Sequence, residues 1–300
     1  MSSNTPVVIE VALNGATRPE SNPHVPQGQE RLVEDALACI EVGATVIHTH
    51  APDISVGGRE GAELYLAHFR PVLEQHPNVV MYPTLVFAPT VEEKTSHIPY
   101  LAEEGLRMGF VDPGSLNLAP TDDTGVPLAD GIVYANSHAD IAYKFELCDW
   151  LGLAPGMAIF EPGFLRTAIA WYKAGRMPRG ALVRLYLGGA SSYRGDGRVD
   201  LLFGLPPTPA SVDTYVDMLE AESVALPWSV AVVSGSTVDN GVAHRALERG
   251  GHLRVGLEDY AGPVRKSNVE LVREAVAVCE QVGRPVARPD DLPKLLDLPR

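Results

Sequence analysis

The sequence GGHLRVGLEDY, residues 250–260, decides the fold and places the first functional residues. If residues 252–258 form a strand, its period of two puts Arg254, Gly256 and Glu258 on one face. The apolar residues between them then face the covering helices. A buried arginine or glutamate is costly unless it is paired, solvated in a cleft or bound to a metal. Two interpretations follow: a structural Arg–Glu pair at the end of a sheet, or the rim of a catalytic site.

A second strand-like stretch, TVIHTH at residues 45–50, favours the catalytic interpretation. His48 and His50 are two residues apart, so in a strand they share one face and are placed to bind one metal ion. The alternative is a pair of packed or surface histidines.

Strand-like and helix-like segments alternate along the whole chain, which predicts an α/β fold. The predicted strands are residues 7–13, 45–50, 79–86, 108–111, 157–160, 182–187, 229–233 and 252–257. The predicted helices are residues 29–42, 62–75, 97–104, 138–151, 164–174, 211–221, 241–249 and 268–282. Eight βα units indicate a single (β/α)₈ TIM barrel domain over residues 1–300, with a proline-containing C-terminal arm at 283–300.

A doubly wound open sheet is the rival fold. It would more often carry a glycine-rich phosphate turn after the first strand, whereas residues 14–18 read NGATR. The long segments 51–60, 112–136 and 188–209 all follow predicted strands, where a barrel carries its active-site loops.

Barrel closure brings the two strand ends together, because strand eight neighbours strand one and strand two lies just beyond. We therefore expect His48, His50 and Glu258 to meet across the mouth. Two histidines and one carboxylate form a catalytic zinc set, although Fe(II) and Mn(II) accept similar ligands.

Several other polar residues fall at predicted strand ends. Asp259 follows Glu258, and it is a candidate base or a partner that holds Arg254; the alternative is an acid without chemistry. Asn14, Thr84 and Asp112 are weaker candidates for contact with a substrate.

The composition excludes some classes of function. The chain has 24 basic and 38 acidic residues and a net charge of −14, which argues against nucleic acid or an anionic membrane as the main partner. The first residues, MSSNTP, do not predict a signal peptide, and no apolar run is long enough to predict a membrane span. Three widely spaced cysteines are typical of reduced thiols, so we expect a cytoplasmic protein.

Three blocks of this sequence resemble the signatures of the β-keto acid cleavage enzymes, whose type member is the 3-keto-5-aminohexanoate cleavage enzyme. The blocks are NGA at 14–16, GATVIHTH at 43–50 and GGHLRVGLED at 250–259, within a likeness that runs from about Val7 to Leu292. The resemblance implies a (β/α)₈ barrel with one zinc ion per chain. The implied ligands are His48, His50 and Glu258, the implied catalytic pair is Arg254 and Asp259, and a substrate-contacting serine matches Thr84.

The resemblance also implies a reaction in which a β-keto acid and acetyl-CoA give acetoacetate and a new acyl-CoA. It further implies a homo-oligomer, for which we expect a tetramer. Some positions depart from the aminohexanoate enzymes. The glutamate that reads the substrate amine is matched by Ala158, a threonine by Phe110, an asparagine by Asp112, and a glutamate after the first strand by Thr17. We therefore expect an amino substrate to be poor, unless Asp112 supplies the missing charge.

Two other functions remain open at this point. One is a zinc-dependent hydrolase or aldolase on the same barrel without CoA. The other is a metal- or ligand-binding barrel without chemistry, although Arg254 and Asp259 argue against it because a metal binder needs neither.

Overall fold

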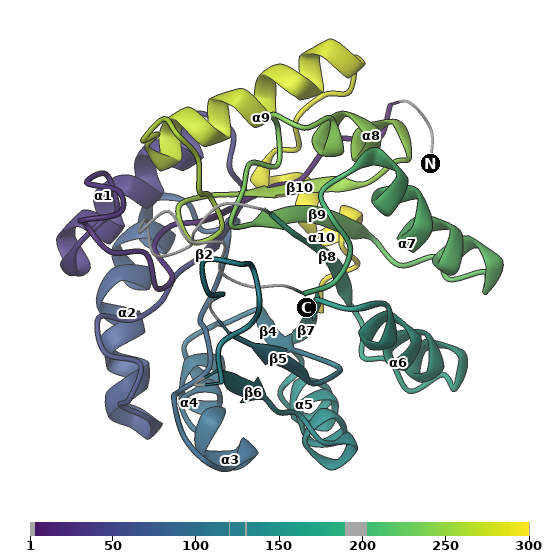
Figure 1. Ribbon diagram of the computed structural model, residues 1–300. Coiled ribbons are helices and arrows are strands. Elements are labelled where there is room, and N and C mark those ends of the chain that lie inside the picture. The colour runs from purple at the N-terminus through teal and green to yellow at the C-terminus, as the bar shows by residue number, and fades with distance from the viewer. Residues whose placement is uncertain (1–3, 120, 130, 190–202, 300) are drawn as a thin grey trace.

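The computed structural model describes residues 4–119, 121–129, 131–189 and 203–299. Eight parallel strands form one sheet in the order β3-β2-β1-β10-β9-β8-β7-β4. The end strands β3 and β4 contact each other, so the sheet forms a nearly closed barrel with helices around it (Figure 1). The strands of this sheet are β1 (Ile9–Ala12), β2 (Val46–His48), β3 (Val80–Tyr82), β4 (Met108–Val111), β7 (Ala154–Ile159), β8 (Leu182–Gly188), β9 (Trp228–Val233) and β10 (His252–Val255).

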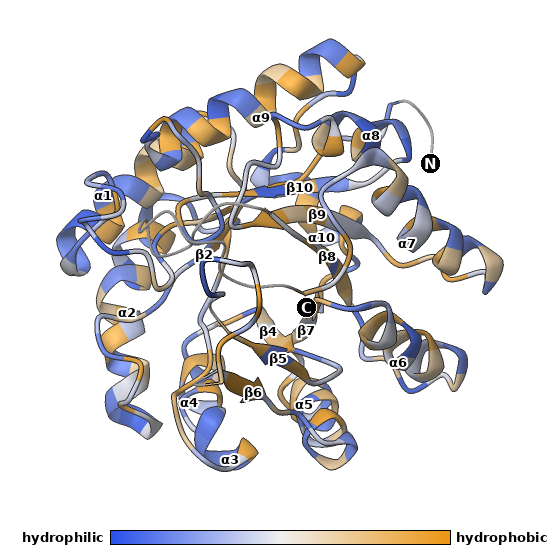
Figure 2. Ribbon diagram, in the orientation of Figure 1, coloured by the Kyte–Doolittle hydropathy of each residue, from blue (hydrophilic) through white to orange (hydrophobic). Residues whose placement is uncertain are grey.

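The helices follow the strands as the alternating pattern predicts, which confirms the (β/α)₈ barrel. They are α1 (Gly28–Glu41), α2 (Gly58–Gln75), α3 (Val91–Lys94), α4 (Ile98–Glu103), α5 (His138–Leu151), α6 (Pro162–Lys173), α7 (Pro209–Ala221), α8 (Val242–Glu248), α9 (Asn268–Val282), η1 (Pro289–Asp291) and α10 (Leu292–Leu295). Hydrophobic residues run through central strands such as β9, while the outer helices mix hydrophobic and hydrophilic residues (Figure 2). In the described ranges, no helix combines the length and apolar character that crossing a membrane requires.

The C-terminal arm covers the end of the barrel where the strands begin. Leu292, Leu296 and Leu298 are buried in one apolar cluster with Val8 and Val46, which lie at the starts of β1 and β2. This plug closes the end opposite to the catalytic loops, so the mouth above the strand ends is the open side of the barrel.

Two details differ from the sequence prediction. The eighth barrel strand, β10, ends at Val255, because Gly256 takes a φ of 131° and the chain turns there. Glu258 therefore projects from a turn and not from the strand face. The predicted loop 112–136 contains an antiparallel hairpin of β5 (Leu116–Leu118) and β6 (Ile132–Tyr134), which lies beside the mouth. The predicted loop 188–209 lies partly outside the described residues.

Candidate active site

Three predicted metal ligands converge at the barrel mouth. His48 is the last residue of β2, His50 follows two residues later, and Glu258 lies in the turn after β10. The Nε2 atom of His48 is 3.1 Å from one Glu258 carboxylate oxygen, and Nε2 of His50 is 3.4 Å from the other. One ligand atom from each residue lies within 4.8 Å of the other two. A single ion can therefore contact all three.

The surrounding chain shapes this cluster. Gly15 has a φ of 53°, and a Cβ atom there would lie 2.3 Å from Cγ of Glu258, so only glycine lets the glutamate cross this turn. The carbonyl of Leu257 accepts a hydrogen bond from Thr17 Oγ1, and its amide donates to the Asn268 side chain at 2.8 Å. These contacts fix the backbone immediately before Glu258.

Both histidines are also held in place. Nδ1 of His48 donates to the carbonyl of Tyr82 at 3.2 Å, so the neutral ring keeps Nε2 free as a ligand. The Asn14 side chain accepts a hydrogen bond from the His50 amide at 2.9 Å and donates to the His50 carbonyl at 3.0 Å. The side-chain amide of Asn14 therefore holds the backbone of His50 in place.

The cluster fits a divalent metal ion. Oε2 of Glu258 is buried and has no hydrogen-bond partner, although it lies 3.1 Å from His48 Nε2 and 3.2 Å from Arg254 Nη2. Neither contact has hydrogen-bond geometry. An oxygen that binds a metal ion shared with His48 and His50 would not need a hydrogen-bond donor. Burial opposes the charge, but His48 and Arg254 lower the pKa of Glu258 well below its usual range. The Glu258 carboxylate is thus ionised, which is the form that binds a metal ion.

Arg254 lies beside the cluster at the centre of a buried charge network. Its Nε is 2.7 Å from Asp259 Oδ2, and its Nη1 is 2.7 Å from both Glu10 Oε1 and the Tyr82 hydroxyl. Glu10 also pairs with Nε of Arg184 at 2.7 Å. All of these side chains are buried, so each charge depends on its partners for compensation.

Asp259 is the acid in this network with a raised pKa. Burial raises the pKa of Asp259 to about 6, and Arg254 beside it acts in the opposite direction. Burial likewise opposes ionisation of Glu10, but Arg184 and Arg254 together bring the pKa of Glu10 down to about 2. Two acids on the same arginine therefore differ in basicity, and only Asp259 is tuned toward neutral pH.

A cavity of about 120 Å³ opens between this network and the far side of the mouth. His48, Arg254 and Glu258 line one side, and Thr84 and Asp112 line the other. Asn14, His50 and Asp259 are not among the lining residues, and Asp259 meets the cavity wall through its contact with Arg254. The departures Phe110 and Ala158 also face this cavity, together with Phe160, Tyr134 and Tyr186.

Comparisons with known proteins identify the family of this chain. The family model described as beta-keto acid cleavage enzyme matches residues 6–298. The chain belongs to the β-keto acid cleavage enzymes. A 3-keto-5-aminohexanoate cleavage enzyme from Fusobacterium nucleatum is 25% identical and the alignment covers 97% of this chain and 98% of the relative. A 3-oxoadipate:acetyl-CoA acetyltransferase from Cupriavidus necator is 26% identical, with 98% and 95% covered.

A solved structure supports the fold alone. The ternary complex of ObcA with a C4-CoA adduct and oxalate has a TM-score of 0.67 and 16% sequence identity, over 92% of this chain and 68% of that chain. At this identity, shared architecture says nothing about a shared substrate.

In this member of the family, sequence reasoning missed part of the network. Glu10, Arg184 and Tyr82 were not predicted as site residues, yet all three contact one another or Arg254 inside the barrel. The available signal was a charged residue in the middle of an otherwise apolar strand, both at Glu10 and at Arg184. Lys144 was also missed, because it lies on the helix α5 and reaches the mouth from outside the barrel.

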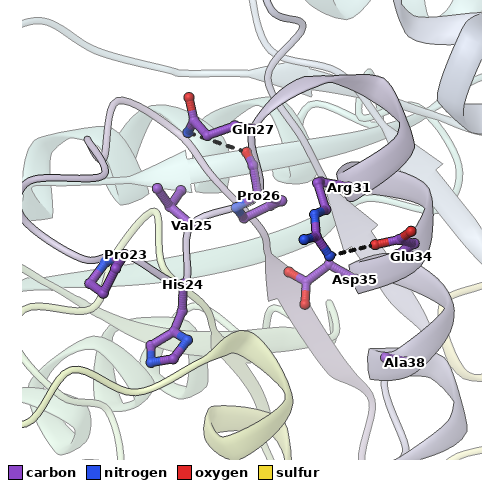
Figure 3. Close-up of a pocket in the computed structure, with 9 residues that line it drawn as sticks. All are labelled: Pro23, His24, Val25, Pro26, Gln27, Arg31, Glu34, Asp35 and Ala38. Atoms are coloured by element: carbon purple, nitrogen blue, oxygen red, sulfur yellow. Dashed lines mark hydrogen bonds and ion pairs between the residues drawn. The ribbon is translucent and has the colours of Figure 1, made fainter.

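A larger hollow of about 490 Å³ lies beside the start of α1 and shares no lining residue with the mouth cavity. Figure 3 shows its charged side chains, where Arg31 pairs with Glu34 at 2.8 Å. Asp35 accepts a hydrogen bond from Asn268 at 2.6 Å, and burial raises the pKa of Asp35 to about 6. We place the candidate active site at the mouth, because the group of His48, His50 and Glu258, which could hold a metal ion, lies there.

Proposed function

We propose that this chain is a zinc-dependent β-keto acid cleavage enzyme that converts a β-keto acid and acetyl-CoA into acetoacetate and a new acyl-CoA. The observation that carries the proposal is the meeting of His48, His50 and Glu258 with the Arg254–Asp259 pair at one mouth, in a chain of this family. The exchange balances without an oxidant. The carbon between the keto group and the carboxylate bonds to the acetyl carbon, and the acetyl–sulfur bond of acetyl-CoA breaks. The bond from that carbon to the original keto carbon then breaks, the released acyl group bonds to the CoA sulfur, and the abstracted proton returns to the acetoacetate.

The metal would be held by His48 Nε2, His50 Nε2 and the Glu258 carboxylate. Two histidines and a glutamate with open positions suit zinc, which is why we choose it over Fe(II) and Mn(II). When bound, the ion supplies Lewis acidity to the keto carbonyl and carboxylate of the substrate. Asn14 and Tyr82 act one step further out, because they orient His50 and His48 through backbone contacts.

Asp259 is the proposed general base for the carbon between keto group and carboxylate. A carboxylate with a pKa of about 6 is largely ionised at neutral pH and still basic enough to accept a proton. Arg254 keeps the Asp259 carboxylate in place at 2.7 Å and carries a permanent charge at the cavity wall. That charge favours a substrate carboxylate and the negative charge that develops after deprotonation.

Thr84 and Asp112 are proposed as substrate contacts on the opposite wall. The backbone around Thr84 is anchored, because its carbonyl accepts a hydrogen bond from His97 Nε2 at 2.9 Å. A cavity of about 120 Å³ suits a small keto acid and leaves the CoA ester to enter from the open side.

The test is an assay of β-keto acids with and without acetyl-CoA, with acetoacetate and acyl-CoA identified by mass spectrometry. We expect both products only when acetyl-CoA is present. Consumption of the keto acid without any CoA ester would refute the exchange and favour the hydrolase or aldolase alternative. Light scattering of the same preparation tests the expected tetramer, which rests on the resemblance alone.

A further inference from the structure

Lys144 is a buried cation that the proposed mechanism does not use. It lies on α5, outside the strands, and only 1% of its side chain is exposed. Its Nζ donates to Oδ1 of Asn136 at 2.7 Å and lies 3.7 Å from Oδ2 of Asp112. A buried ammonium is unfavourable unless a carboxylate compensates it, so this ion pair is what keeps Lys144 inside the protein.

Asp112 occupies the end of β4, where it lines the substrate cavity. The same Oδ2 atom that faces Lys144 accepts a hydrogen bond from the hydroxyl of Tyr134 on β6. The carboxylate is therefore approached by a cation from behind and by a phenol from the side. Its charge is already compensated before any substrate enters the cavity.

The rest of this wall offers no partner for a positive charge. Phe110, Ala158 and Phe160 present apolar surface, and Phe160 stacks on Tyr186 with ring centroids 4.8 Å apart. Asp112 and Glu258 are the acids among the lining residues, and Glu258 belongs to the metal cluster. A substrate ammonium placed here would lose its water and gain no unpaired carboxylate.

We propose that Lys144 is a specificity-determining residue, which neutralises Asp112 from outside the barrel and so excludes β-keto acids with a positively charged side chain. This inference rests on the proposed function, because it assumes that the keto acid occupies this cavity. Lys144 is a positioning residue and not a catalytic one, since it acts through Asp112 and does not line the cavity.

The experiment compares two acids of similar length: 3-ketohexanoate and 5-amino-3-ketohexanoate. Equilibrium binding of each to the zinc-loaded protein is measured by calorimetry without CoA, and kcat/KM is measured separately with acetyl-CoA. We expect the wild type to bind 3-ketohexanoate at least tenfold more tightly than the amino substrate. Equal or tighter binding of the amino substrate overturns the inference.

Variants then assign the preference to Lys144. In Lys144→Met the Asp112 charge loses its cation, so the preference for the uncharged over the amino substrate should shrink about tenfold. The double variant Asp112→Asn with Lys144→Met removes both charges together and should restore the preference. Lys173→Met, which removes an exposed lysine paired with Glu222, is the matched control and should change nothing.

The outcomes separate the two proposals. Wild-type binding in the expected order without formation of acetoacetate would contradict only the proposed reaction. Acetoacetate formation with an unchanged preference in Lys144→Met would contradict only the role of Lys144. If Lys144→Met does not fold, the double variant and the wild-type binding order still test the role of Lys144. The double variant has no charge at position 112 or 144, so a preference for the amino substrate in that variant contradicts the inference.

Discussion

The two sides of the barrel mouth are built on different physical principles. On the side of β1, β2 and β10, charged groups converge: the proposed metal ligands lie beside Arg254, and Glu10 pairs with both Arg254 and Arg184 inside the barrel. On the side of β4, β6 and β7, the wall is largely aromatic or apolar, and its one charged group, Asp112, is compensated by Lys144. We call these the metal side and the substrate side.

This difference assigns the proposed chemistry to the metal side and the selection of the substrate to the substrate side. On the metal side every buried charge depends on several partners, so a single replacement disturbs several ion pairs at once. On the substrate side, Phe110 and Ala158 contact the cavity through apolar atoms, and replacing them changes shape and polarity without breaking a network. Replacements on the substrate side can therefore change selectivity without disturbing the buried charges of the metal side.

The strongest test of the comparison is removal of a metal ligand. His48→Ala and His50→Ala should each lose stoichiometric zinc and lower turnover on the order of a thousandfold or more, because the Lewis acid supplies several kcal/mol to the transition state. Circular dichroism should show an intact barrel. His244→Ala, an exposed histidine on α8, is the control and should keep zinc and activity. Undiminished zinc by elemental analysis in both ligand variants would contradict the assignment.

The second test separates the base from the metal. Asp259→Asn keeps the shape of the side chain but removes the proton acceptor, so turnover should fall roughly 10²–10⁴-fold while zinc stays bound. Arg254→Ala should lower turnover as well, because Asp259 and Glu10 lose the guanidinium that they share. Arg31→Ala, which removes an exposed arginine from α1, is the matched control. Near-normal rates in both site variants would refute these roles and leave the metal assignment untouched.

The metal side could be predicted from sequence because its residues lie in short, contiguous blocks. A His-x-His and an Arg-x-x-x-Glu-Asp at strand ends are brought together by barrel closure alone, and the structure places them together. The precise position of Glu258 could not be predicted, since it depends on the turn at Gly256 and on the space left by Gly15.

The substrate side was largely beyond sequence reasoning. Lys144 is 32 positions from Asp112 in the sequence (144 − 112) and lies on a helix, where a lysine ordinarily faces solvent. Its burial depends on how α5 packs against β4, and Tyr134 reaches Asp112 only because β6 pairs with β5 in a hairpin. No local pattern reports such a contact between distant segments.

The third test uses pH, because a buried histidine forms a hydrogen bond to each wall of the mouth. His68 accepts a hydrogen bond from Oγ1 of Thr49, which lies between His48 and His50 in the sequence, and His97 donates to the carbonyl of Thr84. Burial lowers the pKa of His68 and of His97 to about 4 each. Below the ordinary pKa of about 6.5 the unfolded chain binds these protons and the folded chain does not, so stability falls as the pH drops from about 6.5 to 4.

Each histidine should cost about 3 kcal/mol of unfolding free energy by pH 4. Urea unfolding of the metal-free protein between pH 7 and 4.5 measures this slope. His97→Phe should flatten it by removing one of the buried neutral histidines that contribute to it, whereas replacing the exposed His244 should not. A slope that is unchanged in His97→Phe would show that His97 is not held neutral in the folded protein.

The smallest expected effect concerns Asn14, which connects the first loop to the metal side. Its side chain forms two hydrogen bonds with the backbone of His50 and does not line the cavity. Asn14→Ala should therefore loosen His50 and leave the substrate side unchanged. We expect zinc affinity to fall about 10–100-fold, as for other residues that orient ligands. With saturating zinc, KM for the keto acid should stay close to that of the wild type. Asn78→Ala, at an exposed position that bonds Asp290, is the control. If Asn14 instead contacts the substrate, KM will rise while zinc affinity stays constant, and the boundary between the two sides must then be drawn beyond the first loop.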